Sequence, residues 1–279
     1  MKKGLHSRDV VTVLIITVMC FLAFLWLFPF IWAVVSSLKS ASELATGSFG
    51  LPRDWRWDNY VHGFQRMNYV RSLTNSFIYA GGAALLQCVT CSLAGYALAR
   101  IRFPGSEIVF MLALATLMIP TTVTLTANFV ILHGLGWLDT YLALIIPFGA
   151  SGFAIFLLRQ FFMAIPDELE DAAKMDGAGH FRFLLHVAVP LSRPALATVF
   201  IFVFISEYNS FLWPLIMTSS PGLRVTQVSL TMFTDELGSG LNQGPLMAAS
   251  VLTLLPTVIL FAFLQRTFVR GIAQTGLKG

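Results

Sequence analysis

Charged residues are scarce in this chain of 279 residues: they make up 11% of it, whereas 56% is hydrophobic. A soluble domain usually carries about twice that charged fraction. The deficit excludes an ordinary water-soluble fold, and apolar runs long enough to cross a bilayer recur along the whole sequence. These runs are too continuous for the alternation of a β-barrel, so the sequence predicts an all-α polytopic membrane protein.

Motifs of nucleotide, metal and redox chemistry are also missing. The sequence contains no G-x-x-x-x-G-K-[ST], so the chain cannot cradle ATP phosphates in the P-loop manner. Of three cysteines, Cys88 and Cys91 form C-V-T-C inside an apolar run, without a second pair or a nearby His, and are expected to be small apolar helix residues. His180 and His186 are six residues apart, which is not the i, i+4 spacing of a helical metal site, and are interpreted as surface or packing residues. We therefore predict no metal site, no cofactor and no enzymatic activity in this chain.

Six membrane-spanning helices are predicted from the apolar runs, since each needs about 20 residues to cross ~30 Å of hydrocarbon. The first run is too long for a signal-peptide core and is expected to be retained. Pro120 and Pro256 fall inside the third and sixth helices and predict kinks or breaks there. The predicted spans are 11–36, 74–98, 107–131, 140–162, 194–217 and 246–268.

The basic residues predict the orientation of these spans. With the N-terminus inside, twelve of the 18 Lys and Arg residues fall in inside segments. The other six are Lys39, Arg53, Arg56, Arg66, Arg71 and Arg224. The positive-inside rule therefore places both termini in the cytoplasm. It places the loop between the fourth and fifth spans there too, and puts residues 37–73 and 218–245 outside.

This inside loop, residues 164–190, begins with an acidic helix. Pro166 can open the helix, Asp167 is a plausible N-cap, and Glu170 stands three residues later in capping-box position. Carboxylates in the first turn suit the positive end of the helix dipole. One face of the helix combines small and apolar residues with an acid, at Leu169, Ala172, Ala173 and Asp176.

The second half of the loop is expected to fold back on the membrane domain. Gly177 allows a tight turn, the segment HFRFLLHVAV is mostly apolar, and Pro190 is expected to end it. An amphipathic loop lying on lipid would carry Lys and Arg on its polar face. Here five carboxylates accompany the single Lys174, which favours a basic protein surface as the partner.

The spacing in this loop resembles the EAA loop of permease subunits of type I ABC importers. The matching positions are Ala172, Ala173, Gly177, Val187, Val189 and Pro190, with Asp171 in place of the usual Glu. Further segments resemble the carbohydrate branch of that family and, at the C-terminus, its maltose-type G subunit. They are NSFIYAGGAALLQCVTCSLAGYALARIRFPG (75–105), GLGWLDTYLALIIP (134–147), EYNSFLWPLI (207–216) and QRTFVRGIAQTGLKG (265–279).

The resemblance implies a type I ABC importer permease fold that forms half of a translocation channel. A homologous permease subunit would supply the other half, and two cytoplasmic ATPase subunits would carry ATP and Mg. An extracytoplasmic solute-binding protein would deliver the solute, membrane lipid would surround the spans, and nucleic acid has no part. The implied ATPase-coupling residues are Glu170, Asp171, Ala172, Ala173, Asp176, Gly177 and Pro190. In the C-terminal tail, Gln274 and Lys278 would also contact the ATPase.

The same resemblance suggests three segments. Residues 1–70 would hold the first span and the outer loop, 71–270 the transmembrane domain with the coupling loop, and 271–279 a cytoplasmic tail. The protein would lie in the prokaryotic plasma or inner membrane.

Glu207 is the acidic residue placed deep within a predicted span, which makes it a candidate for the solute pathway. Asn209 is a second candidate, although it points away from Glu207 on a helix. The alternative is a structural bond to another helix. The threonines after Pro120 could satisfy backbone groups that the proline frees, or line a pore.

The sequence thus predicts a non-catalytic permease subunit of an ATP-driven carbohydrate importer. The absence of Lys and Arg in mid-span favours a neutral sugar or polyol. Glycerol-phosphate-type solutes remain an alternative if another subunit supplies the charge. An ion-coupled secondary transporter or a scaffolding protein is a further alternative. The first would be expected to show a repeat and several intramembrane ionisable groups.

Overall fold

The computed structural model describes residues 7–47, 50–233 and 243–276, and helix is the only regular secondary structure among them. The chain divides into two compact units. The first contains residues 1–67 and 230–255, and the second contains residues 68–229 and 256–279.

The first unit contains long α1 and shorter elements of the predicted outer loops. Ser40 and Glu43 form a capping box that starts α2. The side-chain amide of Asn59 in α3 donates to the carbonyls of Ser37 and Lys39 at 2.9 Å, which holds α3 against the end of α1. The elements are α1 (Ser7–Ser37), α2 (Ala41–Ala45), α3 (Asp58–Arg66), η5 (Leu230–Phe233) and the start of α15 (Gln243–Gly276).

The second unit holds most of the helices. They are α4 (Tyr69–Arg100), α5 (Ser106–Ala115), η1 (Thr116–Met118), α6 (Thr121–Gly134), α7 (Tyr141–Ile145), η2 (Ile146–Phe148), α8 (Gly152–Met163), α9 (Asp167–Met175), α10 (His180–Phe183), the π-helical η3 (Leu184–Ala188), α11 (Val189–Leu191), α12 (Arg193–Tyr208), α13 (Leu212–Met217), η4 (Pro221–Leu223) and α14 (Thr226–Ser229).

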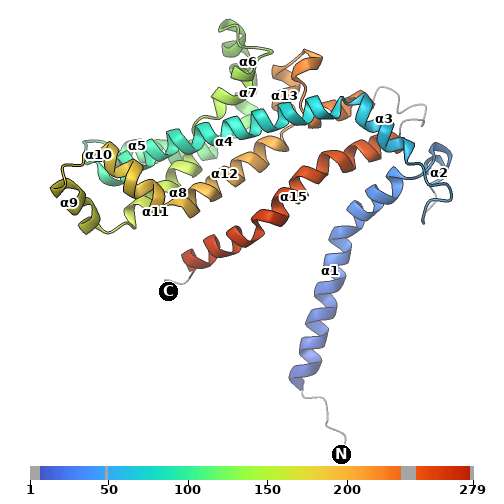
Figure 1. The fold of residues 1–279 in the computed structure, drawn as a ribbon, viewed down its shortest axis with the longest axis horizontal. Helices are drawn as coiled ribbons and strands as arrows, with labels where there is room; N and C mark the ends of the chain where they lie inside the picture. The colour runs from blue at the N-terminus through green and yellow to red at the C-terminus, as the bar shows by residue number, and fades with distance from the viewer. Residues whose placement is uncertain (1–6, 48–49, 234–242, 277–279) are drawn as a thin grey trace, which may run out of the picture. The chain divides into compact units, whose positions relative to one another are not determined.

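Helix α4 is the central element of the second unit, and α8 and α12 lie alongside it (Figure 1). Small residues allow this close packing: a Cβ built on Gly95 would lie 3.1 Å from the backbone nitrogen of Arg159. Leu158, Phe162 and Val199 are buried around that crossing. The C-terminal end of α4 therefore reaches α9 and α10, where the predicted coupling loop lies (Figure 1).

Three predicted spans are single helices that are long and apolar enough to cross a membrane. Residues 11–37 of α1, all of α4, and residues 243–263 of α15 meet that description. Pro256 lies inside α15, which continues through it, so the kink or break predicted there is not a break. Neighbouring helices and side chains can satisfy a backbone group that proline frees within a membrane.

The other three candidate spans are bent pairs of helices. The break expected at Pro120 is confirmed, because α5 with η1 meets α6 at 102° on either side of Ile119 and Pro120. The fourth span predicted over 140–162 corresponds to a bent pair, in which α7 with η2 meets α8 at 48° at a break that was not predicted. Side chains of α4 stabilise this second break, since Gln87 donates to the carbonyl of Phe148 at 2.9 Å and Thr90 donates to that of Gly149.

The predicted fifth span, 194–217, is also not one helix. Helix α12 ends at Tyr208 and α13 begins at Leu212. Pro214 has no N–H to donate to the carbonyl of Ser210, which explains why the α12 helix does not continue into α13. By length and apolar composition, the described residues thus contain three single-helix candidate spans, and up to three more if each bent pair is one span. The third bent pair joins residues 180–191 of the predicted inside loop to α12.

Candidate functional site

Residues 164–190 form the predicted helix, turn and second helical segment. Helix α9 ends in a Schellman motif, in which Gly177 adopts a φ of +75°. Its N–H donates to the carbonyl of Lys174 at 3.0 Å, and the N–H of Ala178 donates to that of Ala173 at 2.8 Å. Pro190 does not end the second segment, because α11 continues to Leu191 and a 78° bend then leads into α12.

The capping box predicted at the start of α9 is wrong. Pro166 occupies the N-cap position, and no side chain caps the helix there. Asp167 is instead the first helical residue, and Glu170 is buried. Instead of capping α9, both carboxylates contact Arg100 at the end of α4.

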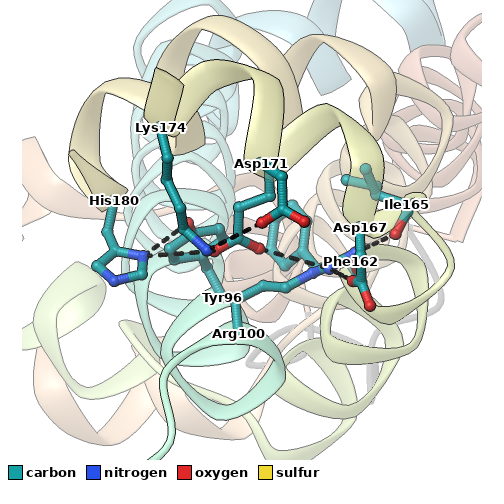
Figure 2. Close-up of polar contacts among 9 residues, drawn as sticks. Tyr96, Arg100, Phe162, Ile165, Asp167, Asp171, Lys174 and His180 are labelled. Atoms are coloured by element: carbon teal, nitrogen blue, oxygen red, sulfur yellow. Dashed lines mark hydrogen bonds and ion pairs between the residues drawn. The ribbon is translucent and has the colours of Figure 1, made fainter. Parts of the chain in front are cut away.

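Arg100 lies at the centre of the contacts that hold α9 in place (Figure 2). Its side chain is 6% exposed. Its Nε and Nη2 donate to the carbonyl of Phe162 at 3.0 and 2.8 Å, and Nη2 also donates to that of Ile165. Nη1 contacts the carboxylates of Asp167 and, at 3.5 Å, Glu170. One guanidinium therefore joins α4 to the end of α8 and the start of α9.

Glu170 makes further contacts on the same side of α9. Its side chain is 9% exposed, and its Oε1 lies 3.1 Å from Nζ of Lys174 and 3.8 Å from Nδ1 of His180. His180 also lies 3.3 Å from the hydroxyl of Tyr96 on α4, so this histidine belongs to the cluster rather than to the bare surface. The hydrogen bond and charge of Glu170 raise the pKa of Lys174.

The opposite side of α9 faces outward. Asp171 has a side chain that is 73% exposed, and its carboxylate lies 3.5 Å from the exposed Lys174. Leu169, Ala172 and Met175 are exposed and form an apolar strip at three-residue spacing. The remaining residues of the predicted coupling set have different surroundings: Ala173 and Pro190 are half-buried, and Asp176 and Gly177 are exposed.

A second feature is a cavity of about 800 Å³ among α4, α6, α8, α12 and the helix breaks. Its walls combine aliphatic side chains and the aromatic rings of Phe148, Phe153, Phe202 and Trp213 with uncharged polar side chains. The polar residues are Gln87, Thr116, Thr121, Thr122, Thr124, Asn128, Ser151, Ser206 and Ser210. Among the described residues that line it, Glu207 is the only ionisable one. Such a mixture of rings and hydroxyl or amide groups suits a polyhydroxylated ligand.

The two predicted pathway residues lie in different places. Glu207 lines the cavity and accepts a hydrogen bond from the hydroxyl of Tyr79. Asn209 is exposed, donates to the carbonyl of Ile205 at 2.8 Å and is not among the cavity residues. Tyr79 and Gln87 were not identified from the sequence, although each is a polar residue within the span predicted at 74–98.

The remaining predicted features add no site. Cys91 is buried, and the thiol of Cys88 lies 3.7 Å from the carbonyl of Leu196. Among the described residues, no group of three His, Cys, Asp or Glu is placed to hold a metal ion. In the tail, Gln274 belongs to α15, whereas Lys278 lies outside the described residues.

Comparisons with known proteins identify similar chains. Residues 91–274 match the family described as binding-protein-dependent transport system inner membrane component. The chain is 34% identical over 256 residues to the sn-glycerol-3-phosphate transport system permease protein UgpE of Yersinia pestis bv. Antiqua (strain Antiqua), over 89% of this chain and 91% of that one. It is 33% identical over 262 residues to the arabinooligosaccharides transport system permease protein AraQ of Bacillus subtilis (strain 168), over 92% of both.

Solved structures share the fold. A bacterial ABC transporter involved in the import of the acidic polysaccharide alginate contains a chain that matches with a TM-score of 0.83 and 23% identity, over 95% of this chain and 99% of that one. A second structure, of an alginate ABC transporter in complex with alginate pentasaccharide-bound periplasmic protein, matches with a TM-score of 0.62 and 15% identity, over 92% and 94%. At these identities the likeness shows an all-helical membrane permease fold.

Proposed function

The chain belongs to the family of inner membrane components of binding-protein-dependent transport systems, and we propose that loop 164–190 couples it to a cytoplasmic ATPase. Family membership makes it a multi-pass permease subunit of an ABC importer in the bacterial inner membrane, which overturns the alternative of an ion-coupled secondary transporter. It works with a solute-binding protein. In this proposal a second, homologous permease subunit completes the channel, and ATP and Mg bind to a pair of ATPase subunits.

The observation that carries the proposal is the two-sided character of α9. Glu170 is buried against Arg100, whereas Asp171, Ala172 and Met175 face outward on the same short helix. An exposed carboxylate beside an apolar strip suits a basic protein surface better than an anionic lipid headgroup. Of the two adjacent acids, Asp171 is therefore the one available to a basic residue of the ATPase, and Glu170 serves contacts within the chain.

The proposed arrangement has six spans with both termini in the cytoplasm. It is supported by three single helices, by the bent pairs at the predicted third and fourth spans, by α12, and by the excess of basic residues on one side. ATP binding would move the docked loop, and the helices attached to it would alternate the access of the cavity between the two sides. Residues Gln274 and Lys278 of the tail would add a second contact with the ATPase.

A neutral carbohydrate is the proposed solute. The relatives are named for sn-glycerol-3-phosphate and for arabinooligosaccharides, so similarity alone supports both classes. Glu207 is the ionisable group among the described residues of the cavity, and its carboxylate would repel a phosphate. The proposal therefore assigns Glu207 as an acceptor for solute hydroxyl groups. Asn209 would contact solute only outside this cavity.

Docking is tested by substitutions in the coupling loop. In Ala172→Trp a large ring replaces an exposed methyl group on the outward face. In Gly177→Pro the N–H and the positive φ that form the Schellman motif are both lost. Each variant should insert normally but lose copurification with the ATPase subunit, and uptake should fall on the order of tenfold or more. Leu135→Trp adds the same ring at an exposed position after α6 and serves as the control. Normal copurification and uptake in both loop variants would rule out docking at this loop.

A further inference from the structure

The joint between α8 and α9 is a short segment whose backbone groups need hydrogen-bond donors. The last carbonyls of a helix receive no hydrogen bond from an N–H group of the same helix. Here α8 ends at Met163 and α9 begins at Asp167. Arg100 donates to the carbonyls of Phe162 and Ile165, on either side of Ala164. A side chain from α4 therefore fixes the path of the backbone between a membrane helix and the coupling helix.

The same guanidinium also fixes the first turn of α9. Its remaining nitrogen contacts Asp167, which is 88% exposed, and Glu170, which is 9% exposed. The planar fork of arginine offers five N–H donors in fixed directions, which a lysine ammonium cannot reproduce. Since the pair with Glu170 is buried, separating it would leave both charges in a poorly solvated place.

We infer that Arg100 is a positioning residue that makes α9 and the cytoplasmic ends of α4 and α8 move as one rigid body. The inference rests on the proposed docking of α9 to an ATPase. A push on the outward face of α9 reaches α4 through this guanidinium, rather than being absorbed by bending at residues 164–166. Arg100 thus determines how far a movement of loop 164–190 displaces the helices that line the cavity around Glu207.

A neighbouring arginine provides a matched control. With Arg100, Arg159 on α8 lines a polar pocket at the end of α4, which is separate from the cavity lined by Glu207. Arg159 is 12% exposed and donates to the carbonyl of Leu98 at 3.2 Å. Its carboxylate contact is Glu107 on α5 at 2.7 Å, and its guanidinium lies 4.0 Å from the centre of the Phe110 ring. Arg159 therefore joins α8 to α4 and α5, and its hydrogen bonds, ion pair and ring contact are with those two helices.

The first experiment measures the joint without any partner subunit. Spin labels at Met175 on α9 and at Ile101 after α4 report the distance across the joint, in a background without the three native cysteines. The unaltered joint should give one narrow distance distribution. Arg100→Gln should broaden it, Arg100→Lys should restore it only in part, and Arg159→Gln should leave it narrow. An equally narrow distribution in Arg100→Gln would overturn the inference while leaving docking untouched.

The second experiment measures coupling in the whole transporter. In proteoliposomes with the ATPase and a loaded binding protein, Arg100→Gln should retain copurification with the ATPase. The ATP hydrolysed per solute imported should rise on the order of tenfold. Arg159→Gln should leave that ratio unchanged. An unchanged ratio in Arg100→Gln would refute the inference.

If Arg100→Gln does not fold, Glu170→Gln tests the same ion pair from the other side. This substitution keeps the shape of the side chain and removes its charge. Its effect on the ratio should exceed that of Asp167→Asn, since Glu170 is buried and Asp167 is exposed. Equal effects of the two substitutions would count against a role for the buried pair. Loss of ATPase copurification in Ala172→Trp tests docking separately.

Discussion

At the scale of single residues, Asp139 links two loops of the second unit. Its backbone N–H donates to the carbonyl of Met217 at 2.9 Å. Its carboxylate accepts the N–H groups of Ser219 and Ser220 at 3.0 and 2.9 Å and also the hydroxyl of Ser220. These hydrogen bonds lower the pKa of Asp139, and the bond from the Ser220 hydroxyl has the largest effect.

The lowered pKa gives a prediction about acid stability. A carboxylate with a depressed folded pKa stabilises the fold above its unfolded pKa of about 3.9, and this contribution is lost as the pH falls through the folded value. Asp139→Asn keeps the positive φ that Asn tolerates and should destabilise the purified protein by about 1–2 kcal/mol at pH 7.

Thermal unfolding in detergent measures this effect. The difference between the parent protein and Asp139→Asn should shrink as the pH is lowered below about 4. Asp54→Asn is the same substitution at an exposed position and should change the unfolding temperature little at any pH. A constant difference across the whole pH range would show that the charge of Asp139 is not the cause.

At the scale of helices, small residues decide where elements touch. A Cβ on Gly152, at the start of α8, would lie 2.2 Å from the carbonyl oxygen of Ala113 on α5. Backbone atoms cannot move aside as the tip of a side chain can, so Gly152→Ala should push α8 away from α5. Overpacking of this kind costs about 1–3 kcal/mol, and the unfolding temperature should fall accordingly.

Gly81 on α4 is the matched control. A Cβ there would meet no atom within 4 Å, so Gly81→Ala should be neutral or slightly stabilising because alanine is the better helix former. Equal unfolding temperatures for the two alanine variants would contradict the close approach of α5 and α8. The comparison needs only the purified chain and a thermal unfolding scan.

The helix breaks show what the sequence could predict. Pro120 interrupts an apolar run and gives its own signal, and the break at that position is confirmed. The break before Gly152 also has a local signal, in Pro147 and Gly149, which the predicted span did not take into account. Hydrogen bonds from Gln87 and Thr90 of another helix stabilise it. Apolar periodicity therefore located the spans, and prolines mark the breaks within them, which contacts between helices then stabilise.

The same distinction applies to the coupling loop. The turn at Gly177 has a local cause in the freedom of glycine, and the sequence located it. The capping box failed because Arg100, 70 positions before Glu170, attracts that carboxylate. In the sequence Arg100 was noted only as one basic residue on the inside. The sequence does contain a signal for this ion pair: a basic residue ends the second span, and an acidic helical turn follows the fourth span.

At the scale of the whole molecule, the orientation in the membrane can be tested with two exposed residues. Leu135 follows α6 and Met175 ends α9, and both have largely exposed side chains. The proposed topology places Leu135 outside and Met175 in the cytoplasm. In intact cells a membrane-impermeant maleimide should label Leu135→Cys, whereas Met175→Cys should react only after permeabilisation.

Labelling of Met175→Cys in intact cells would contradict the proposed topology. It would mean that the orientation is inverted or that the number of spans is different. The background would lack the three native cysteines, of which Cys20 is exposed on α1. Permeabilised cells that express the chain without its ATPase subunits provide the control, because no docked ATPase then covers Met175→Cys and both introduced cysteines should react fully. The measurement tests whether the excess of basic residues correctly predicts which side of the membrane each loop of this chain faces.

The order of the two adjacent acids on α9 has a consequence for how such loops are compared or redesigned. Glu170 and Asp171 carry the same charge, yet helix geometry turns one toward Arg100 and the other outward. Exchanging them would preserve composition, net charge and the acidic appearance of the segment. It would also shorten the inward side chain by one methylene, so the exchanged sequence would not make the same contacts. A substitution table that scores Asp and Glu as near-equivalents misses the property that distinguishes an inward anchor from an outward recognition group.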